Sequence, residues 1–244
     1  MDKNERVTLL QNILADLGCS LDQHTKILDV GCGAGGLVME FKENGFKAYG
    51  CDLKYKEGQH VSFLKEKGYI KLIDSNTFEF PFEDNKFDVV LSDQVLEHVN
   101  DHSIMFKEIH RVLKPGGISL HIFPSCYMPI EPHVYVPLAT IFQNKWWLYF
   151  WAVIGVRSNQ QKGNAVNMVV QQNYEYLKNC TNYLTKLEMA HQVEEYFSRY
   201  CFCEKLFLKY SRRGKILYSG SKILPFLPSA YSALRNRVLA FWKD

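Results

Sequence analysis

The chain has 244 residues, with 29 Lys or Arg against 26 Asp or Glu. This length suits one α/β domain with an insertion, or at most two small domains. A hydrophobic fraction of 47% and a charged fraction of 23% exclude a disordered or fibrous chain. Residues 205–244 carry nine Lys or Arg and one acid, whereas the remainder carries 20 basic and 25 acidic residues. A mildly acidic body therefore precedes a strongly basic C-terminal part.

Cysteine usage and hydropathy indicate the compartment. Seven cysteines, an odd number, occur without any CxxC pair, so we expect reduced thiols in a cytoplasmic protein rather than a disulfide or zinc framework. The N-terminus lacks the apolar core of a signal peptide. The most apolar run, residues 146–156, has 11 residues, which is too short to span a bilayer of about 30 Å. These features exclude a membrane-spanning protein but not one that contacts the inner face of a membrane.

The first half of the chain alternates between helix and strand patterns. Apolar periodicity and Gly or Pro stop signals predict, in chain order, a helix near 7–17, strand 26–30, helix 37–44, strand 47–52, helix 56–67, strand 69–74, strand 87–92, helix 95–113 and strand 118–123. This alternation predicts an α/β fold in which helices cover both faces of a mostly parallel sheet.

The second half is less regular. Residues 124–180 look like an insertion, or lid, that is too small to bury a core of its own. A capping box at Thr185–Glu188 opens a helix that is expected to reach about Arg199, and strands are expected at 202–210 and 215–218. We expect one domain over 1–222, followed by a basic amphipathic tail at 223–244. In that tail the residues spaced like one helical face are Leu227, Tyr231, Leu234, Val238 and Phe241 or Trp242.

The strongest local signal is the run ILDVGCGAGG at 27–36, in which an apolar strand enters glycines that open a helix. Glycines let the backbone approach a ligand closely, and Gly31, Gly33 and Gly36 match the dinucleotide pattern GxGxxG. The pattern alone does not distinguish a nicotinamide site from another nucleoside site. Asp52 ends the next predicted strand, where its carboxylate can accept hydrogen bonds from two ribose hydroxyls.

Four ordered blocks resemble the class I S-adenosylmethionine-dependent methyltransferases, of the methyltransferase-11 group. The blocks are DVGCGAGG at 29–36, Asp52, FPFEDNKFDVVLSDQVLEHV at 80–99 and EIHRVLKPGG at 108–117, and they cover about residues 25–124. The resemblance implies a Rossmann-like, doubly wound, seven-stranded sheet. It also implies S-adenosylmethionine as cofactor, with S-adenosylhomocysteine as its product.

The resemblance also assigns roles to individual residues. Asp29 would brace the glycine turn, and Asp52 and Leu53 would hold the ribose and flank the adenine. Asn76 and Thr77 would meet the adenine edge, with Asp74 as the alternative. The residues expected under the methionine part of the cofactor are Gly31, Cys32, Gly33 and Gly35, and those expected beside the methyl group are Ser92, Asp93 and Gln94.

The insertion offers a candidate for proton transfer. Glu131-Pro132-His133 follows the fifth predicted strand, and loops at the carboxyl ends of strands border the ligand site in open α/β sheets. A histidine, whose pKa is ordinarily about 6.5, can accept a proton from an attacking hydroxyl, with Glu131 orienting it. His98 is expected to pack or to hydrogen-bond. No cluster of metal ligands is apparent, so no metal is expected.

These signals predict methyl transfer to a small or lipid-linked acceptor, with oxygen as the expected atom and glycan or cell-surface biosynthesis as the suggested setting. The alternative is carbon or nitrogen transfer to a quinone-like or other small metabolite. More distant alternatives are a nicotinamide-dependent oxidoreductase and a non-catalytic scaffold. Membrane contact is expected through 146–156 and 223–244, and the alternative is that these segments dock on protein. No nucleic-acid partner is expected.

Overall fold

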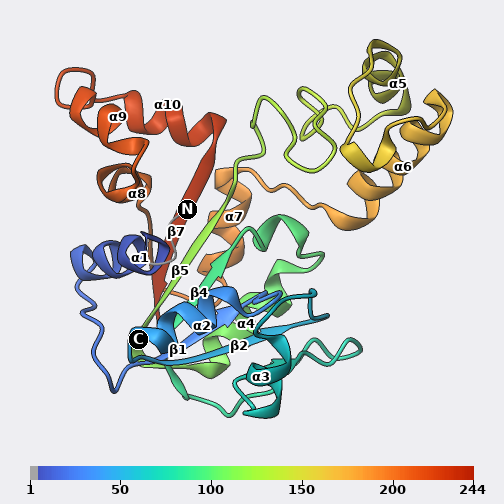
Figure 1. The fold of residues 1–244 in the computed structure, drawn as a ribbon. Coiled ribbons are helices and arrows are strands. Elements are labelled where there is room, and N and C mark those ends of the chain that lie inside the picture. The colour runs from blue at the N-terminus through green and yellow to red at the C-terminus, as the bar shows by residue number, and fades with distance from the viewer. Residues whose placement is uncertain (1–4) are drawn as a thin grey trace.

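A computed structural model describes residues 5–244. Its centre is a seven-stranded sheet in the order β3-β2-β1-β4-β5-β7-β6 (Figure 1). The strands are β1 (Lys26–Val30), β2 (Lys47–Asp52), β3 (Ile70–Leu72), β4 (Phe87–Asp93), β5 (Leu113–Pro124), β6 (Arg199–Phe202) and β7 (Asn236–Trp242). The first five strands run parallel, and β7 is antiparallel to both β5 and β6. The predicted α/β sheet is confirmed.

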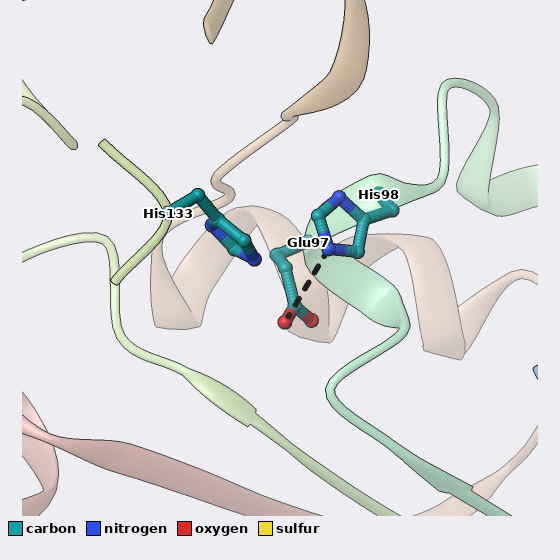
Figure 2. A group of neighbouring side chains, drawn as sticks. All are labelled: Glu97, His98 and His133. Carbon is teal, nitrogen blue, oxygen red and sulfur yellow. Dashed lines mark ion pairs between the residues drawn. The ribbon is translucent and has the colours of Figure 1, made fainter. Parts of the chain in front are cut away.

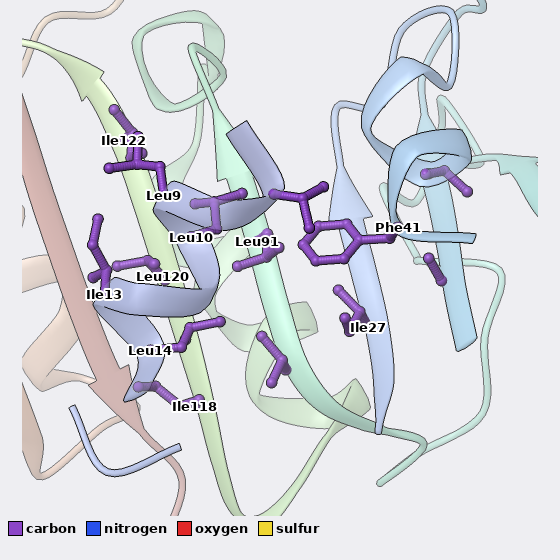
Figure 3. Close-up of a cluster of buried hydrophobic side chains, with 14 of the residues drawn as sticks. Leu9, Leu10, Ile13, Leu14, Ile27, Phe41, Leu91, Ile118, Leu120 and Ile122 are labelled. Atoms are coloured by element: carbon purple, nitrogen blue, oxygen red, sulfur yellow. The ribbon is translucent and has the colours of Figure 1, made fainter. Parts of the chain in front are cut away.

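Helices cover both faces of this sheet. The helices within the described residues are α1 (Glu5–Asp16), α2 (Gly36–Glu43), α3 (Val61–Glu66), α4 (His102–Val112), α5 (Lys145–Ile154), α6 (Val166–Cys180), α7 (Lys186–Glu194), α8 (Glu204–Tyr210), α9 (Gly214–Gly220) and α10 (Leu227–Leu234), with short 3-10 turns η1 (Leu96–His98) and η2 (Asn159–Gln161). On one face, Leu10, Ile13 and Leu14 of α1 pack on the apolar side chains of β5 (Figure 3). On the other, Phe106 of α4 and Val193 of α7 pack against β4 and β7.

The region after β5 forms a separate small layer. Leu148 and Ala152 of α5 are fully buried and belong to one apolar cluster with Val169 and Leu177 of α6. Figure 1 shows α5 and α6 standing beyond the end of β5, away from the sheet. The insertion therefore has an apolar cluster of its own, contrary to the expectation from its size, because two amphipathic helices bury their apolar faces against each other.

The predicted helix over 95–113 is in fact two elements. The turn η1 ends at His98, Val99 is extended, and α4 begins after Asp101, whose carboxylate accepts a hydrogen bond from the backbone N–H of Ile104. An N-cap of this kind begins a new helix rather than continuing an old one. The break leaves Glu97 and His98 on a turn at the carboxyl end of β4.

The C-terminal expectations are wrong. The predicted strands at 202–210 and 215–218 are helices α8 and α9, and the second half of the predicted tail at 223–244 is β7. Val238 and Ala240 face one core cluster and Leu239 and Phe241 the other, so all four are fully buried. A strand covered on both faces has a continuous apolar run, and in β7 some of these apolar residues also lie at the spacing of a helical face, which is why a helix was predicted.

Candidate active site

The glycine loop joins β1 to α2 in a conformation that favours glycine. Gly31, Gly33 and Gly35 have φ angles of 75°, 54° and 72°. A Cβ added at Gly31 would lie 2.4 Å from Cγ2 of Val95, which follows β4. The loop is therefore pressed against the end of the neighbouring strand, and a side chain at Gly31 would be both strained and obstructed.

Three carboxylates meet this loop from the carboxyl ends of adjacent strands. Asp29 lies in β1, while Asp52 and Asp93 are the last residues of β2 and β4. Oδ2 of Asp52 accepts a hydrogen bond from the backbone N–H of Gly33 at 2.7 Å. Burial, reinforced by the charge of Asp52, raises the pKa of Asp29 to about 7 although Arg6 opposes the shift. Asp93 Oδ1 is buried and has no hydrogen-bond partner within residues 5–244.

Arg6 reaches the same place from the first turn of α1. Its guanidinium forms an ion pair with Asp93, and the charges of Asp29 and Glu40 favour its protonated form. Burial nevertheless lowers the pKa of Arg6. Sequence reasoning missed Arg6, since a basic residue on the polar face of an amphipathic helix carries no signal of its own.

Cys32 sits inside the loop and is buried. Burial, together with the charges of Asp29 and Asp52, raises the pKa of its thiol. This environment suits a small packing residue and not a thiolate nucleophile.

The residues expected near the adenine lie after β2 and β3. The Leu53 side chain is half exposed, next to Asp52. Asp74 Oδ1 accepts hydrogen bonds from the backbone N–H groups of Asn76, at 2.8 Å, and Thr77, at 3.2 Å. These bonds hold the pKa of Asp74 below its ordinary value. Asp74 therefore shapes the turn that presents Asn76 and Thr77, and both assignments for the adenine edge stay predictions.

The residues expected beside the methyl group point in different directions. Ser92 is buried within the sheet, where its hydroxyl hydrogen-bonds to Nδ1 of His121 at 2.6 Å. Asp93 reaches the face that carries Arg6, and Gln94 adopts a φ of 57° directly after the strand. The Ser92 hydroxyl is thus already used inside the protein, whereas Val95, the residue after Gln94, packs against the glycine loop at Gly31.

The structure brings the predicted pair Glu131 and His133 together. Glu131 is fully buried, and its Oε1 lies 2.7 Å from Nδ1 of His133. It also accepts hydrogen bonds from the Tyr183 hydroxyl and from the backbone N–H groups of His133 and Val134. Burial opposes ionisation, but the bonds from His133, Tyr183 and Val134 outweigh it, so the pKa of Glu131 lies below its ordinary value. An ionised Glu131 therefore accepts a hydrogen bond from the Nδ1–H of His133 and leaves the Nε2 lone pair of His133 available.

Glu97 and His98 of η1 complete a cluster with His133 (Figure 2). The rings of His98 and His133 lie 4.8 Å apart, and Nε2 of His98 is 4.0 Å from Oε1 of Glu97. Burial, with the nearby charge of Glu131, raises the pKa of Glu97 to about 7. Each of the three offers one metal-ligand atom, all within 4.8 Å of one another. The expectation of no ligand cluster is therefore wrong, because only the pairing of β4 with β5 brings the two loops together.

Comparisons with known proteins fit this geometry. Residues 28–120 match a family model described as a methyltransferase domain, Methyltransf_11. The demethylmenaquinone methyltransferase of Staphylococcus aureus is 29% identical over 191 residues, which cover 76% of this chain and 71% of that protein. The sterol 24-C-methyltransferase ERG6B of Gibberella zeae is 36% identical over 98 residues, 38% of this chain. The matched segment spans only 26% of the length of that sterol enzyme.

A solved structure shares the fold. Phosphoethanolamine N-methyltransferase 2 of Haemonchus contortus, determined with phosphomonomethylethanolamine and S-adenosylhomocysteine, superposes with a TM-score of 0.55 at 17% identity. The match covers 98% of this chain and 52% of that protein. At this identity the likeness concerns the arrangement of the sheet and helices.

Proposed function

Because the chain belongs to the methyltransferase-11 family of class I S-adenosylmethionine-dependent methyltransferases, we propose that it methylates a carbon atom of a small, hydroxylated, largely apolar acceptor of the quinol type. One observation carries this choice of acceptor. Similarity to a demethylmenaquinone methyltransferase extends over 191 residues, well beyond the cofactor-binding segment at 28–120. The relatives favour the carbon or nitrogen alternative over transfer to oxygen in glycan or cell-surface biosynthesis.

The glycine-loop end of the site fits the cofactor. The carboxyl groups of Asp29, Asp52 and Asp93 come from the carboxyl ends of three adjacent strands beside the glycine loop, with Arg6 paired to Asp93. S-adenosylmethionine carries a positive sulfonium and ammonium group, and when bound it supplies a methyl group that is already activated for displacement. The buried, unpartnered Asp93 Oδ1 is the polar atom, among those of residues 5–244 near the loop, that such a cation would satisfy. We assign Asp52 to the ribose hydroxyls and Leu53 to the adenine face.

The chain's main chemical task is to position the acceptor and to remove its hydroxyl proton. A quinol carbon becomes nucleophilic when the adjacent hydroxyl loses its proton and the freed electron pair moves into the ring. After methylation that carbon would release its own hydrogen as a proton, and the oxygen would regain one, so that the ring returns to the quinol. In the metal-free chain, we assign this proton to Nε2 of His133, because Glu131 holds Nδ1 at 2.7 Å. Tyr183 also bonds to Glu131 and would keep that carboxylate in place. Alignment supplies much of the rate in such a displacement, so the base contributes a smaller part.

The cofactor assignment is tested by calorimetry with S-adenosylhomocysteine. Two charge-assisted hydrogen bonds to ribose are worth roughly 1.5–3 kcal/mol each, so Asp52→Ala should weaken binding at least about 100-fold. Asp16→Ala is the matched control, since that exposed carboxylate pairs with Lys209 at the far end of α1. Binding of NADH without binding of S-adenosylhomocysteine would overturn the proposal in favour of an oxidoreductase.

The acceptor class is tested by transfer of a labelled methyl group to reduced quinones, sterols, phenols, lipid-linked sugars and amines. We expect transfer to a quinol carbon, and we expect His133→Ala to reduce turnover about 100-fold or more while S-adenosylhomocysteine still binds. Label found only on oxygen of a lipid-linked sugar would instead support the glycan setting. Full activity of His133→Ala would remove the base assignment.

Exposed apolar side chains suggest where a membrane-borne acceptor would be met. No helix within residues 5–244 is long and apolar enough to cross a membrane. However, α5 presents Trp146, which is 85% exposed, together with Phe150 and Ile154. The α9–α10 segment presents Ile216 and Ile223 among basic residues at 212, 213, 215 and 222. We assign both segments to an anionic lipid surface, which favours cations beside apolar side chains.

Both segments leave the sheet at the same end. Pro124, the last residue of β5, pairs with Asn236, the first of β7, so the insertion begins where α10 ends. The double variant Trp146→Glu/Phe150→Glu should lose co-sedimentation with phosphatidylglycerol vesicles, whereas Leu187→Glu, an exposed site on α7, should not. Equal binding of both variants, or no binding by the wild type, would refute membrane contact. Point variants are needed because deletion of 223–244 would remove β7.

A further inference from the structure

We propose that Glu97, His98 and His133 form a binding site for one divalent transition-metal ion of the zinc type. The three residues come from two loops, η1 after β4 and the segment after β5. Their ligand atoms lie within 4.8 Å of one another, and Figure 2 shows the far ring nitrogen of His133 pointing toward Glu97. The proposal goes beyond the proposed function, because binding of an ion does not depend on what the protein methylates.

Both histidines are held in the way that metal-binding histidines are held. Nδ1 of His98 lies 2.6 Å from the backbone carbonyl oxygen of Cys180, which can only accept a hydrogen bond. Nδ1 of His133 lies 2.7 Å from the Glu131 carboxylate. Each Nδ1 therefore carries its hydrogen, and each Nε2 is left with a lone pair. Histidine ligands of metals almost always donate their other ring N–H to a carbonyl or carboxylate in this manner.

The third ligand is a buried carboxylate that lacks a hydrogen-bond partner among the described residues. Glu97 is 2% exposed, and neither of its oxygens accepts a hydrogen bond from residues 5–244. A buried polar group without a partner is destabilising, and native proteins rarely keep one without a reason. An ion between Glu97 and the two Nε2 atoms would satisfy the carboxylate, whereas a purely structural role leaves it unexplained.

The geometry is close to that of a loaded site. Ligand atoms about 2.0–2.2 Å from a tetrahedral zinc ion lie about 3.3 Å apart, so the cluster would contract by at most about 1.5 Å. Side-chain rotation can supply this, since the His98 side chain is 34% exposed and that of His133 is 27% exposed. Two imidazoles and one carboxylate suit zinc or a neighbouring transition metal better than magnesium or calcium, which prefer oxygen ligands.

Three protein ligands leave at least one position open, as in catalytic metal sites. If the ion is present, an acceptor hydroxyl bound there would release its proton to solvent and remain as an oxygen anion on the metal. Nε2 of His133 would then serve as a ligand and not as the base. This role of the ion in removing the acceptor proton rests on the proposed function, whereas binding of the ion does not.

Binding is tested on the full chain, freed of metal with a chelator and titrated with Zn²⁺ in a calorimeter. We expect one ion per chain and at least about tenfold weaker binding in each of His98→Ala, His133→Ala and Glu97→Gln. Glu131→Gln, which changes the carboxylate behind His133 and none of the three proposed ligands, should weaken binding about 10- to 100-fold. His191→Ala is the matched control, because that exposed histidine also neighbours a carboxylate, Glu194, on α7.

Two further measurements separate the outcomes. Binding of S-adenosylhomocysteine by each variant shows that the variant is folded, and its failure in the wild type would contradict the proposed function without touching the metal site. Co²⁺ in place of Zn²⁺ should give a visible spectrum without thiolate-to-metal bands, which excludes binding to the cysteines. The proposal is overturned if the wild type binds no Zn²⁺ at millimolar concentration, or if folded His98→Ala and His133→Ala bind it as the wild type does.

Discussion

His121 is expected to make the stability of the protein depend on pH. This histidine of β5 is fully buried, and its two ring nitrogens lie 2.6 Å from the hydroxyls of Ser92 and Ser119. Its ring stacks on Phe241 with centroids 4.9 Å apart. Burial without an opposite charge lowers the pKa of His121 from 6.5 to about 3.

The direction of the effect follows from proton binding in the two states. Between pH 6.5 and about pH 3, the unfolded chain protonates His121 whereas the folded chain does not. The free energy of unfolding therefore falls as the pH drops below 6.5. At pH 5 the gap from the unfolded pKa is about 1.5 units, and at about 1.4 kcal/mol per unit the contribution lost is about 2 kcal/mol.

Urea unfolding at pH 7 and pH 5 measures this loss. His121→Gln keeps a side chain that can hydrogen-bond to both serines but does not titrate, so its stability should fall by about 2 kcal/mol less than that of the wild type between the two pH values. Contributions from other titrating groups are shared by both proteins and cancel in the difference. Equal losses in the wild type and the variant would refute the assignment of the low pKa to His121.

Three other substitutions test the local structure. Ser92→Ala should lower the free energy of unfolding by about 1 kcal/mol, because the Ser92 hydroxyl hydrogen-bonds to His121. The affinity for S-adenosylhomocysteine, measured by calorimetry, should not change, and weaker binding would show that Ser92 contacts the cofactor. Gly31→Ala should weaken that binding at least about tenfold through its φ of 75° and its clash with Val95, and Val95→Ala should restore only part of it, since the backbone strain remains. Thr185→Ala should cost about 1 kcal/mol in urea unfolding by removing the capping box of α7, and an unchanged midpoint would show that the cap is not used.

The five parallel strands were predictable because local patterns and long-range contacts agree there. β1, β2 and β4 are short strands that are each followed along the chain by a helix, whereas β3 leads to β4 without one. The carboxyl ends of such strands meet at one edge, so Asp52 could be placed near the glycine loop from its position in the chain, whereas Asp29 and Asp93 were placed there by the resemblance to the methyltransferases. The periodicity of α1 was also sufficient, since Leu10, Ile13 and Leu14 are buried as expected.

The C-terminal region was not predictable in the same way. Val238 and Phe241 lie at helical spacing from Leu234, yet they belong to β7, whose two neighbours lie far away in the sequence. Residues 236–242 form a strand because they pair with β5 on one side and with β6 on the other. The basic residues of 205–244 are accordingly divided: Arg237 and Lys243 lie in or beside the sheet, and the others border α8 to α10.

The sequence by itself indicated the parallel strands β1 to β5 and the glycine loop after β1, and it placed Glu131 and His133 in the loop after β5, because each depends on residues that are close in the chain or follow a strand. The tertiary structure alone decided what that pair faces. Glu97 and His98 come within reach of His133 because β4 and β5 are adjacent and the helix after β4 breaks at Val99. Local patterns do not encode such a meeting of two loops, since it depends on strand pairing and on a cap at Asp101 that displaces the start of α4.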